Sequence, residues 1–157
     1  MERDNWFFSI TEKIGDYSKC LSRKIGVIAV KDNKYIIATG YNGPPSKYPP
    51  CQKVCPRRKL GYNSGEGLEI CPSEHSERNV INEAARLGIK LEDTTLYMNC
   101  GIPCRECAKA IVNSGIKEIV CVNGDIYPEP GLSGLDILSK CGVKIRIKKR
   151  RIKNDTL

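Results

Sequence analysis

The sequence predicts one α/β domain, a three-layer α/β/α fold built on a five-stranded mixed sheet. Two β-rich runs, 25–30 and 35–39, are separated by four residues, as in a hairpin. Three later helical patterns each end at a glycine that is followed by Ile or Val and then Lys, and these glycines are 27 residues apart. Runs with strand character follow the glycines at 94–98, 117–122 and 143–148, so they complete the sheet. A chain of 157 residues suits one such domain.

The first element is a helix that Asp4 or Asn5 caps and that runs to roughly Lys19. Its apolar face is expected to contain Trp6, Phe7, Ile10, Ile14 and Tyr17. After the hairpin, the run 40–45 is expected to break the second strand. From there to Pro72 the chain is rich in Pro, Gly and Cys and has no hydrophobic period, which predicts a long loop. Loops of that length in compact domains are usually functional or tied down.

The regular second half should contain helices at 74–87, 104–114 and 132–141. The last three strands are expected to be parallel, because helices connect them and such crossovers are right-handed. The helices at 74–87 and 104–114 then begin on one face of the sheet. Side chains at these two helix starts can therefore meet.

Two short clusters at these helix starts predict a catalytic zinc site. His75 and Glu77 open the first of the two helices, and Cys104 and Cys107 open the second. One imidazole and two thiolates are three ligands, which leaves the fourth position of a zinc ion for water. Glu77 is expected beside that water, as the group that moves its proton. The plainer alternatives, a redox C-x-x-C pair or half of a structural zinc site, give no role to His75, the only histidine in the chain.

A second group of cysteines lies around the long loop. Three of its members belong to the loop and one ends the first helix: Cys51, Cys55, Cys71 and Cys20. Four thiolates can close a structural zinc site that has no position for water. The alternative is four unrelated buried cysteines that act as small apolar residues. Three cysteines in a polar, proline-rich loop favour the metal.

The net charge of +8 comes largely from the end of the chain. Residues 144–153 contain seven basic residues and no acidic one, and without them the net charge is about +1. The first part of this run alternates as a strand should, so we expect a domain at 1–147 and a basic tail at 148–157. The tail is either a solvated end or a patch that attracts phosphates.

Composition also bears on the compartment. No run of about 18 apolar residues is present, so no membrane-spanning helix is expected. The start MERDNWFF carries charges too early for a signal peptide. Nine cysteines, an odd number, with metal-type spacings indicate a reducing compartment, and we expect the cytoplasm.

Four motifs of the chain carry a family resemblance that covers about 4–147. They are Cys20-Leu-Ser-Arg-Lys-Ile-Gly26-Val, Gly40-Tyr-Asn-Gly43-Pro, His75-Ser-Glu77-Arg-Asn and Pro103-Cys104-Arg-Glu-Cys107-Ala-Lys-Ala-Ile. The last two resemble the zinc signature of the cytidine/deoxycytidylate deaminase superfamily. The first two, with the cysteines before His75, resemble the deoxycytidylate (dCMP) deaminase branch.

This resemblance implies zinc-dependent hydrolytic deamination of dCMP to dUMP, which supplies thymidylate synthesis. It also implies an extra zinc near the active site and a homo-oligomer, often a hexamer that dCTP and dTTP regulate. Asn42 is implied to hold the nucleotide, although Asn-Gly also suits a plain turn. Ser76 stands where the family usually has Ala, and groups near it are expected to contact the base. Arg23 and Lys24 are either phosphate contacts or solvated side chains.

Three further readings of the chain remain open at the level of sequence. In the first, the substrate is another cytosine nucleotide, such as dCTP or a modified dCMP. In the second it is a base in single-stranded nucleic acid or tRNA, which the basic tail favours and the 6% aromatic content opposes, because base-flipping sites use stacking surfaces. The third is a zinc-stabilised binding module without activity, against which the intact Glu77 argues.

Overall fold

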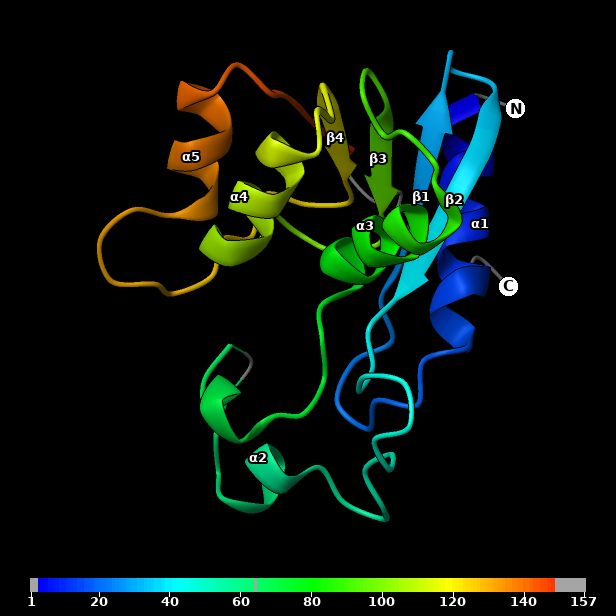
Figure 1. The fold of residues 1–157 in the computed structure, drawn as a ribbon. Helices are drawn as coiled ribbons and strands as arrows, with labels where there is room; N and C mark the ends of the chain where they lie inside the picture. Colours follow the sequence, from blue (N-terminus) through cyan, green and yellow to red (C-terminus); the bar gives the residue numbers. More distant parts are fainter. Residues whose placement is uncertain (1–2, 64, 149–157) are drawn as a thin grey trace, which may run out of the picture.

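The computed structural model describes residues 3–63 and 65–148. The strands are β1 (Gly26–Lys31), β2 (Tyr35–Tyr41), β3 (Thr95–Met98), β4 (Glu118–Cys121) and β5 (Lys144–Ile147). The helices are α1 (Arg3–Asp16), α2 (Pro56–Lys59), α3 (Ser76–Leu87), α4 (Arg105–Asn113) and α5 (Gly134–Lys140), with a short 3-10 helix, η1 (Leu68–Ile70). The strand order is β2-β1-β3-β4-β5, and Figure 1 shows helices packed against this sheet. The predicted fold class is confirmed.

The sheet is mixed, as the connections require. β1 pairs antiparallel with β2 and with β3, whereas β3, β4 and β5 are parallel. Asp32 and Asn33 both have positive φ, 53° and 51°, which is the backbone of a tight hairpin turn with the twist that strands prefer. The parallel pairs confirm the predicted helical crossovers.

The second strand ends inside the run 40–45, as predicted, but it is two residues longer than the predicted 35–39. It continues to Tyr41, and Gly40 pairs in register with Val27. A Cβ atom at Gly40 would lie 2.5 Å from the Val80 nitrogen and 2.6 Å from the Ser76 oxygen. The glycine is therefore needed for the close packing of α3 on β2, and not for a turn.

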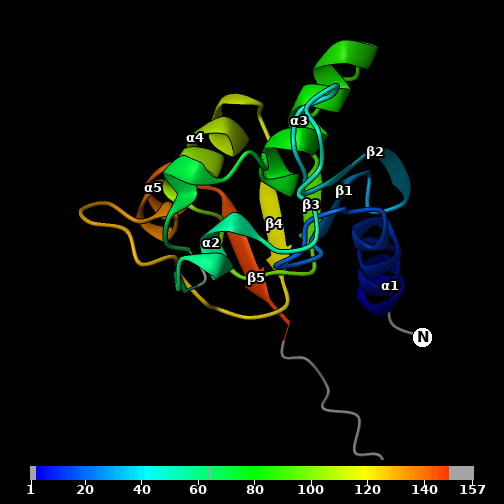
Figure 2. The same ribbon diagram turned by 90° about the horizontal axis from the view of Figure 1, so that it is seen from below.

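Two cores lie on the two faces of the sheet, because alternate strand residues point to opposite sides. One face packs against α1 alone, and the other packs against α3, α4 and α5, as Figure 2 shows. The α1 side is formed by Phe7, Phe8, Ile28, Val30, Tyr97 and Val120. The larger core on the other side includes Val27, Ala29, Leu96, Met98, Ile119 and residues of the three helices. Both α3 and α4 are thus held rigidly against one face.

The apolar face of α1 differs from the predicted one. Phe7 is fully buried as expected, but Trp6 and Tyr17 are 44% and 73% exposed, and Phe8 is buried in their place. The helix ends at Asp16 and not near Lys19. Asp4 does not cap the helix, because its carboxylate accepts hydrogen bonds from the Tyr97 hydroxyl and the Arg146 guanidinium, both at 2.7 Å. Contacts distant in sequence decided which side of this helix faces the sheet.

The predicted long loop contains two short helical pieces, α2 and η1, but no strand among its described residues. Figure 1 shows it extending below the sheet and leading directly into α3. No described helix has both the length and the apolarity needed to cross a membrane. The basic tail, apart from Lys148, lies outside the described residues.

Candidate active site

His75, Cys104 and Cys107 meet where α3 and α4 begin. His75 is the residue before α3, Cys104 is the residue before α4, and Cys107 lies in the first turn of α4. The Nδ1 atom of His75 is 3.4 Å from the Sγ atom of each cysteine, and the three donor atoms lie within 4.8 Å of one another. Within the described residues, no other group of three or more His, Cys, Asp or Glu side chains meets this distance.

The donor atoms have the spacing that a zinc ion needs. Tetrahedral bonds of about 2.3 Å to sulfur and 2.0–2.1 Å to nitrogen place those atoms roughly 3.6 Å apart. Hydrogen bonds from Cys107 and His75 lower the pKa of Cys104 to about 4. The contact with Cys104 raises the pKa of His75 to about 8 and also raises the pKa of Cys107. A thiolate next to an imidazole and a second thiol is a donor set that suits zinc.

Glu77 lies beside this cluster but outside it. Its side chain is 4% exposed, and its Oε2 atom accepts a hydrogen bond of 2.9 Å from the Ser76 hydroxyl, which is fully buried. Burial raises the pKa of Cys100 and of Tyr127, and the nearby Glu77 charge raises both further. The carboxylate is therefore fixed in direction, and Glu77 lines the same space as His75.

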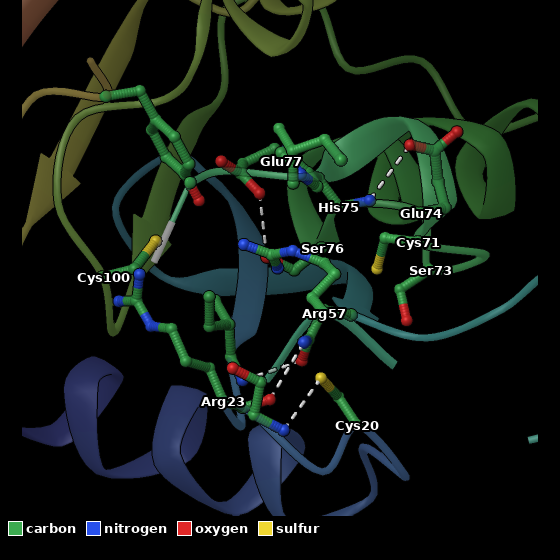
Figure 3. Close-up of a pocket in the computed structure, with 16 residues that line it drawn as sticks. Cys20, Arg23, Arg57, Cys71, Ser73, Glu74, His75, Ser76, Glu77 and Cys100 are labelled. Carbon is green, nitrogen blue, oxygen red and sulfur yellow. Dashed lines mark hydrogen bonds between the residues drawn. The ribbon is translucent and has the colours of Figure 1, made fainter. Parts of the chain in front are cut away.

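That space is a pocket, shown in Figure 3. Its walls come from segments far apart in the chain, and they include Arg23, Asn42, Arg57, Ser76, Glu77, Cys100 and Tyr127. The Tyr127 ring stacks near the His75 ring, with centroids 5.9 Å apart and planes inclined by 26°. The cavity is thus surrounded by one member of the ligand cluster, His75, and by a carboxylate, an aromatic ring and two guanidinium groups, which is the arrangement of an active site.

The start of α4 is held by the loop between β4 and α5. The Glu129 carboxylate accepts hydrogen bonds of 2.8 and 3.1 Å from the Arg105 backbone N–H, which has no partner inside the helix. The Arg105 guanidinium donates in turn to the Pro130 carbonyl at 2.9 Å. A Cβ atom at Gly134 would lie 1.9 Å from the Pro103 oxygen, so α5 also presses on this start. The positions of Cys104 and Cys107 are therefore fixed from several sides.

The family model of the cytidine and deoxycytidylate deaminase zinc-binding region matches residues 1–123. The chain belongs to this family.

Individual relatives agree with this membership of the deaminase family. The deoxycytidylate deaminase of Schizosaccharomyces pombe is 34% identical over 118 residues, which are 74% of this chain and 36% of that protein. The deoxycytidylate deaminase of Saccharomyces cerevisiae is 31% identical over 144 residues, which are 91% of this chain and 44% of that protein. This chain therefore spans less than half of the length of either yeast protein. The deoxycytidylate deaminase of Mycobacterium phage D29 is 34% identical over 122 residues, 74% of this chain and 91% of the phage protein.

Solved structures share the fold. The dCMP deaminase of the cyanophage S-TIM5, in complex with dCMP and dUMP, superposes with a TM-score of 0.73 at 24% identity. The match covers 93% of this chain and 96% of that one. Zinc is supported by the family's zinc-binding region together with the His75, Cys104 and Cys107 cluster.

The other residues named from sequence are distributed unequally around the pocket. Ser76 and Arg23 line it, whereas Lys24 lies outside it and donates from Nζ to the Ser18 carbonyl at 2.7 Å. Asn42 also lines it, but its amide holds the backbone: Oδ1 accepts from the Ile25 N–H and Nδ2 donates to the Arg23 carbonyl, both at 2.9 Å. Asn42 therefore fixes the segment that carries Arg23.

The second group of cysteines is loosely gathered. Cys55 is buried and the other three are partly exposed. Burial raises the pKa of Cys51, and the charges of Cys55, Cys71 and Cys20 raise it further, so these three cysteines lie in the neighbourhood of Cys51. In the part of the chain that the structure describes, no three of them are as close together as the His75 cluster. The backbone N–H of Ser22 donates to the Cys20 sulfur at 3.4 Å.

Tyr127, Arg57 and Glu129 were missed by sequence reasoning. Tyr127 and Glu129 stand in an irregular segment and Arg57 stands in the four-residue helix α2, and hydrophobic periodicity gives no information in either place. The signals that were available are weak: a tyrosine next to proline in the loop after β4, and an arginine directly after a Cys-Pro pair in the long loop.

Proposed function

We propose that this protein catalyses the hydrolytic deamination of dCMP to dUMP and depends on zinc. One observation carries the proposal: His75, which forms a cluster of three zinc-type ligands with Cys104 and Cys107, lines one pocket together with a separate buried carboxylate, Glu77, in a member of the deaminase family. The choice of dCMP is supported by the relatives in yeasts and phages, which are deoxycytidylate deaminases.

His75, Cys104 and Cys107 would hold the zinc ion. When bound, zinc lowers the pKa of water from about 15.7 to roughly 7, which makes the nucleophile available at neutral pH. Glu77 takes a proton from the water that adds to carbon 4 of the cytosine ring. It passes protons to the ring nitrogen and to the amine, which leaves as ammonia while the carbonyl of dUMP forms. The Ser76 hydroxyl holds Oε2 of Glu77 during these transfers.

The remaining walls of the pocket bind the substrate in this proposal. The Tyr127 ring lies over the base, and backbone groups near Ser76 and Cys104 contact its edge. Arg23 faces the phosphate, and Asn42 keeps the Arg23 segment in position. Lys24 is left out, because its ammonium group is used by backbone carbonyls outside the pocket.

Ammonia release tests the function on a panel of dCMP, dCTP, CMP, deoxycytidine and single-stranded DNA. We expect dCMP to give the highest kcat/KM. Preferred turnover of dCTP would move the proposal to another cytosine nucleotide. No release from any of the five would refute it.

We propose that nucleic acid is not the substrate. The basic run of 144–153 favours a polymer, but its described members have intramolecular partners. Lys144 and Arg146 pair with Glu118 at 3.3 and 2.8 Å, and Lys148 donates to Asn5. Their charges are therefore partly neutralised on the α1 side of the sheet, away from the pocket.

A second zinc ion is proposed for Cys20, Cys51, Cys55 and Cys71, where it would be structural. The proposal is supported by the nearness of the other three cysteines to Cys51, and the Cys20 sulfur already accepts a backbone hydrogen bond, as zinc-bound thiolates can. Zinc content measured on protein purified without chelator tests this, with two ions per chain expected. One ion, with these thiols open to alkylation in the native protein, would refute it.

Three wider expectations belong to the same proposal. The protein forms a homo-oligomer, with a hexamer as the proposed form and with dCTP and dTTP as effectors. It works in the cytoplasm, which is supported by nine cysteines that are all free in the structure. Residues 1–147 form the deaminase domain, and 148–157 form a basic tail.

A further inference from the structure

Two guanidinium groups enter the pocket from different parts of the chain. Arg23 comes from the segment before β1, and Arg57 comes from α2 in the cysteine-rich segment, which we define as residues 51–71. Figure 3 shows the two side chains reaching the cavity from different sides, with Arg23 directed toward Cys100. The cysteine-rich segment thus contributes one positive charge, that of Arg57, to the wall of the pocket.

The charge of Arg57 is not neutralised inside the protein. In the described parts of the chain, no Asp or Glu carboxylate lies within 4.0 Å of the Arg57 or the Arg23 guanidinium, although seven such ion pairs occur elsewhere. The pocket glutamate nearest in sequence to the metal ligands, Glu74, pairs with Arg78 at 3.1 Å. An unpaired, half-buried guanidinium at a pocket wall is suited to an anion that comes from outside.

Arg57 is also aimed and held. Its Nε donates to the Glu66 carbonyl and its Nη2 donates to the Asn63 carbonyl, the latter at 3.0 Å. The Glu66 carboxylate is itself used by the Asn63 N–H at 2.8 Å, so it does not reach the guanidinium. An arginine has five N–H donors, and these two bonds leave the others for a ligand. A guanidinium fixed in this way loses little side-chain entropy when it binds an anion.

We propose that Arg57 binds the 5′-phosphate of the substrate, and that the cysteine-rich segment thereby makes the enzyme select nucleotides over nucleosides. This inference rests on the proposed function, because it assumes a cytosine compound in the same pocket. The base and the reacting carbon face the metal ligands and Glu77, so Arg57 contributes to binding and not to the proton transfers.

The test compares Arg57→Ala and Arg57→Lys with Arg58→Ala. Arg58 is the next residue in α2, but it is exposed, donates to the Ser22 hydroxyl at 3.2 Å and does not line the pocket. Initial rates of ammonia release give kcat/KM for dCMP and for deoxycytidine, and zinc content is measured for each variant as a check of folding. Competitive inhibition by dUMP and by deoxyuridine gives a second comparison that does not require turnover of the nucleoside.

We expect Arg57→Ala to lower the ratio of the dCMP and deoxycytidine kcat/KM values by about 100-fold, because one bidentate contact to a phosphate is lost. The dUMP affinity should fall by a similar factor and the deoxyuridine affinity should stay. Arg57→Lys should recover part of the loss, and Arg58→Ala should leave the ratio unchanged.

Two results would overturn the inference: an unchanged ratio in Arg57→Ala, or equal losses for nucleotide and nucleoside, which would make Arg57 a structural residue. A wild-type protein that deaminates no compound of the panel refutes the proposed function instead. Binding of dUMP against deoxyuridine, measured by calorimetry on the same variants, then still decides the role of Arg57.

Discussion

The start of α3, which carries His75, and the cysteine-rich segment contribute to one pocket, but they are held in opposite ways. α3 and α4 lie on a sheet face whose side chains are almost fully buried. Among the described residues of 44–73, only Cys55 is buried, and apolar side chains such as Val54 and Leu60 are 56% and 68% exposed. Apolar burial therefore holds the helix starts with the metal ligands and Glu77 in place, whereas the segment with Arg57 needs another source of order. A metal at its cysteines is the proposed source.

The largest expected effect separates the chemistry from this segment. Glu77→Gln should lower kcat for dCMP by at least about 10³-fold, because proton transfers by a positioned residue contribute roughly 10²–10⁴-fold and Glu77 serves several of them. Zinc content and the free energy of unfolding should change little. Glu83→Gln, on the exposed side of the same helix, is the control. Near-normal turnover in the Glu77 variant would show that the proton carrier is misassigned.

The next effect tests what holds the segment. Cys55→Ser should reduce the zinc content from two ions per chain to one, because Cys55 is the buried member of the second group. Losing a structural metal costs about 3 kcal/mol or more. For a chain of this size, that corresponds to a Tm lower by roughly 6–12 °C. Calorimetry and elemental analysis give both quantities.

Cys141→Ser is the matched control, since Cys141 is exposed and outside both groups. A Cys55 variant with the same Tm and the same zinc content as this control would mean that the segment is ordered without metal. The contrast between the two regions would then need another explanation.

A smaller effect concerns the scaffold at acidic pH. Burial raises the pKa values of Asp4 and Glu118, but hydrogen bonds from Arg146 outweigh it, so both pKa values are below the ordinary 3.8 and 4.5. A lowered carboxyl pKa stabilises the fold above the unfolded pKa, and this stabilisation is lost as the pH falls. We therefore expect the free energy of unfolding to decrease as the pH is lowered below about 4.5. Because the groups are partly exposed, Asp4 should account for roughly 1 kcal/mol.

Denaturant titrations between pH 6 and pH 3 measure this dependence. Asp4→Asn should flatten it, and Asp16→Asn should not, because the Asp16–Lys13 pair is highly exposed at 3.6 Å. An unchanged slope in the Asp4 variant would remove the Arg146 cluster from the list of stabilising contacts.

The smallest effect is expected from the tail. Removal of 149–157 should leave kcat/KM for dCMP within about twofold, since a mononucleotide contacts the pocket and not a long surface. If the substrate were a polymer, the truncated protein would instead bind it more weakly, and the binding would depend less steeply on salt, because each lost phosphate contact removes counterion release. Rates at increasing salt, on dCMP and on single-stranded DNA, distinguish the two.

What could be predicted from sequence is what local pattern determines. The spacing of His75, Cys104 and Cys107 and the glycines that end the helices were sufficient for the metal cluster and the sheet. The partners of Asp4 could not be found in this way, because Tyr97 and Arg146 lie 93 and 142 residues further along the chain. That cluster decided which face of α1 is buried. The segment with Arg57 has no hydrophobic period, so the pocket that Arg57 lines together with Glu77 could not be predicted either.

The hydrogen bonds from the Arg105 backbone N–H to Glu129 have a consequence for how this protein can be altered. The loop that presents Tyr127 to the cavity is also the clamp on the helix that presents Cys104 and Cys107. A change of base preference is therefore best sought by exchanging the single side chain at 127. Grafting a different loop would remove the Glu129 carboxylate that accepts from the Arg105 backbone N–H. A redesign aimed at selectivity would then weaken the support of Cys104 and Cys107 as metal ligands.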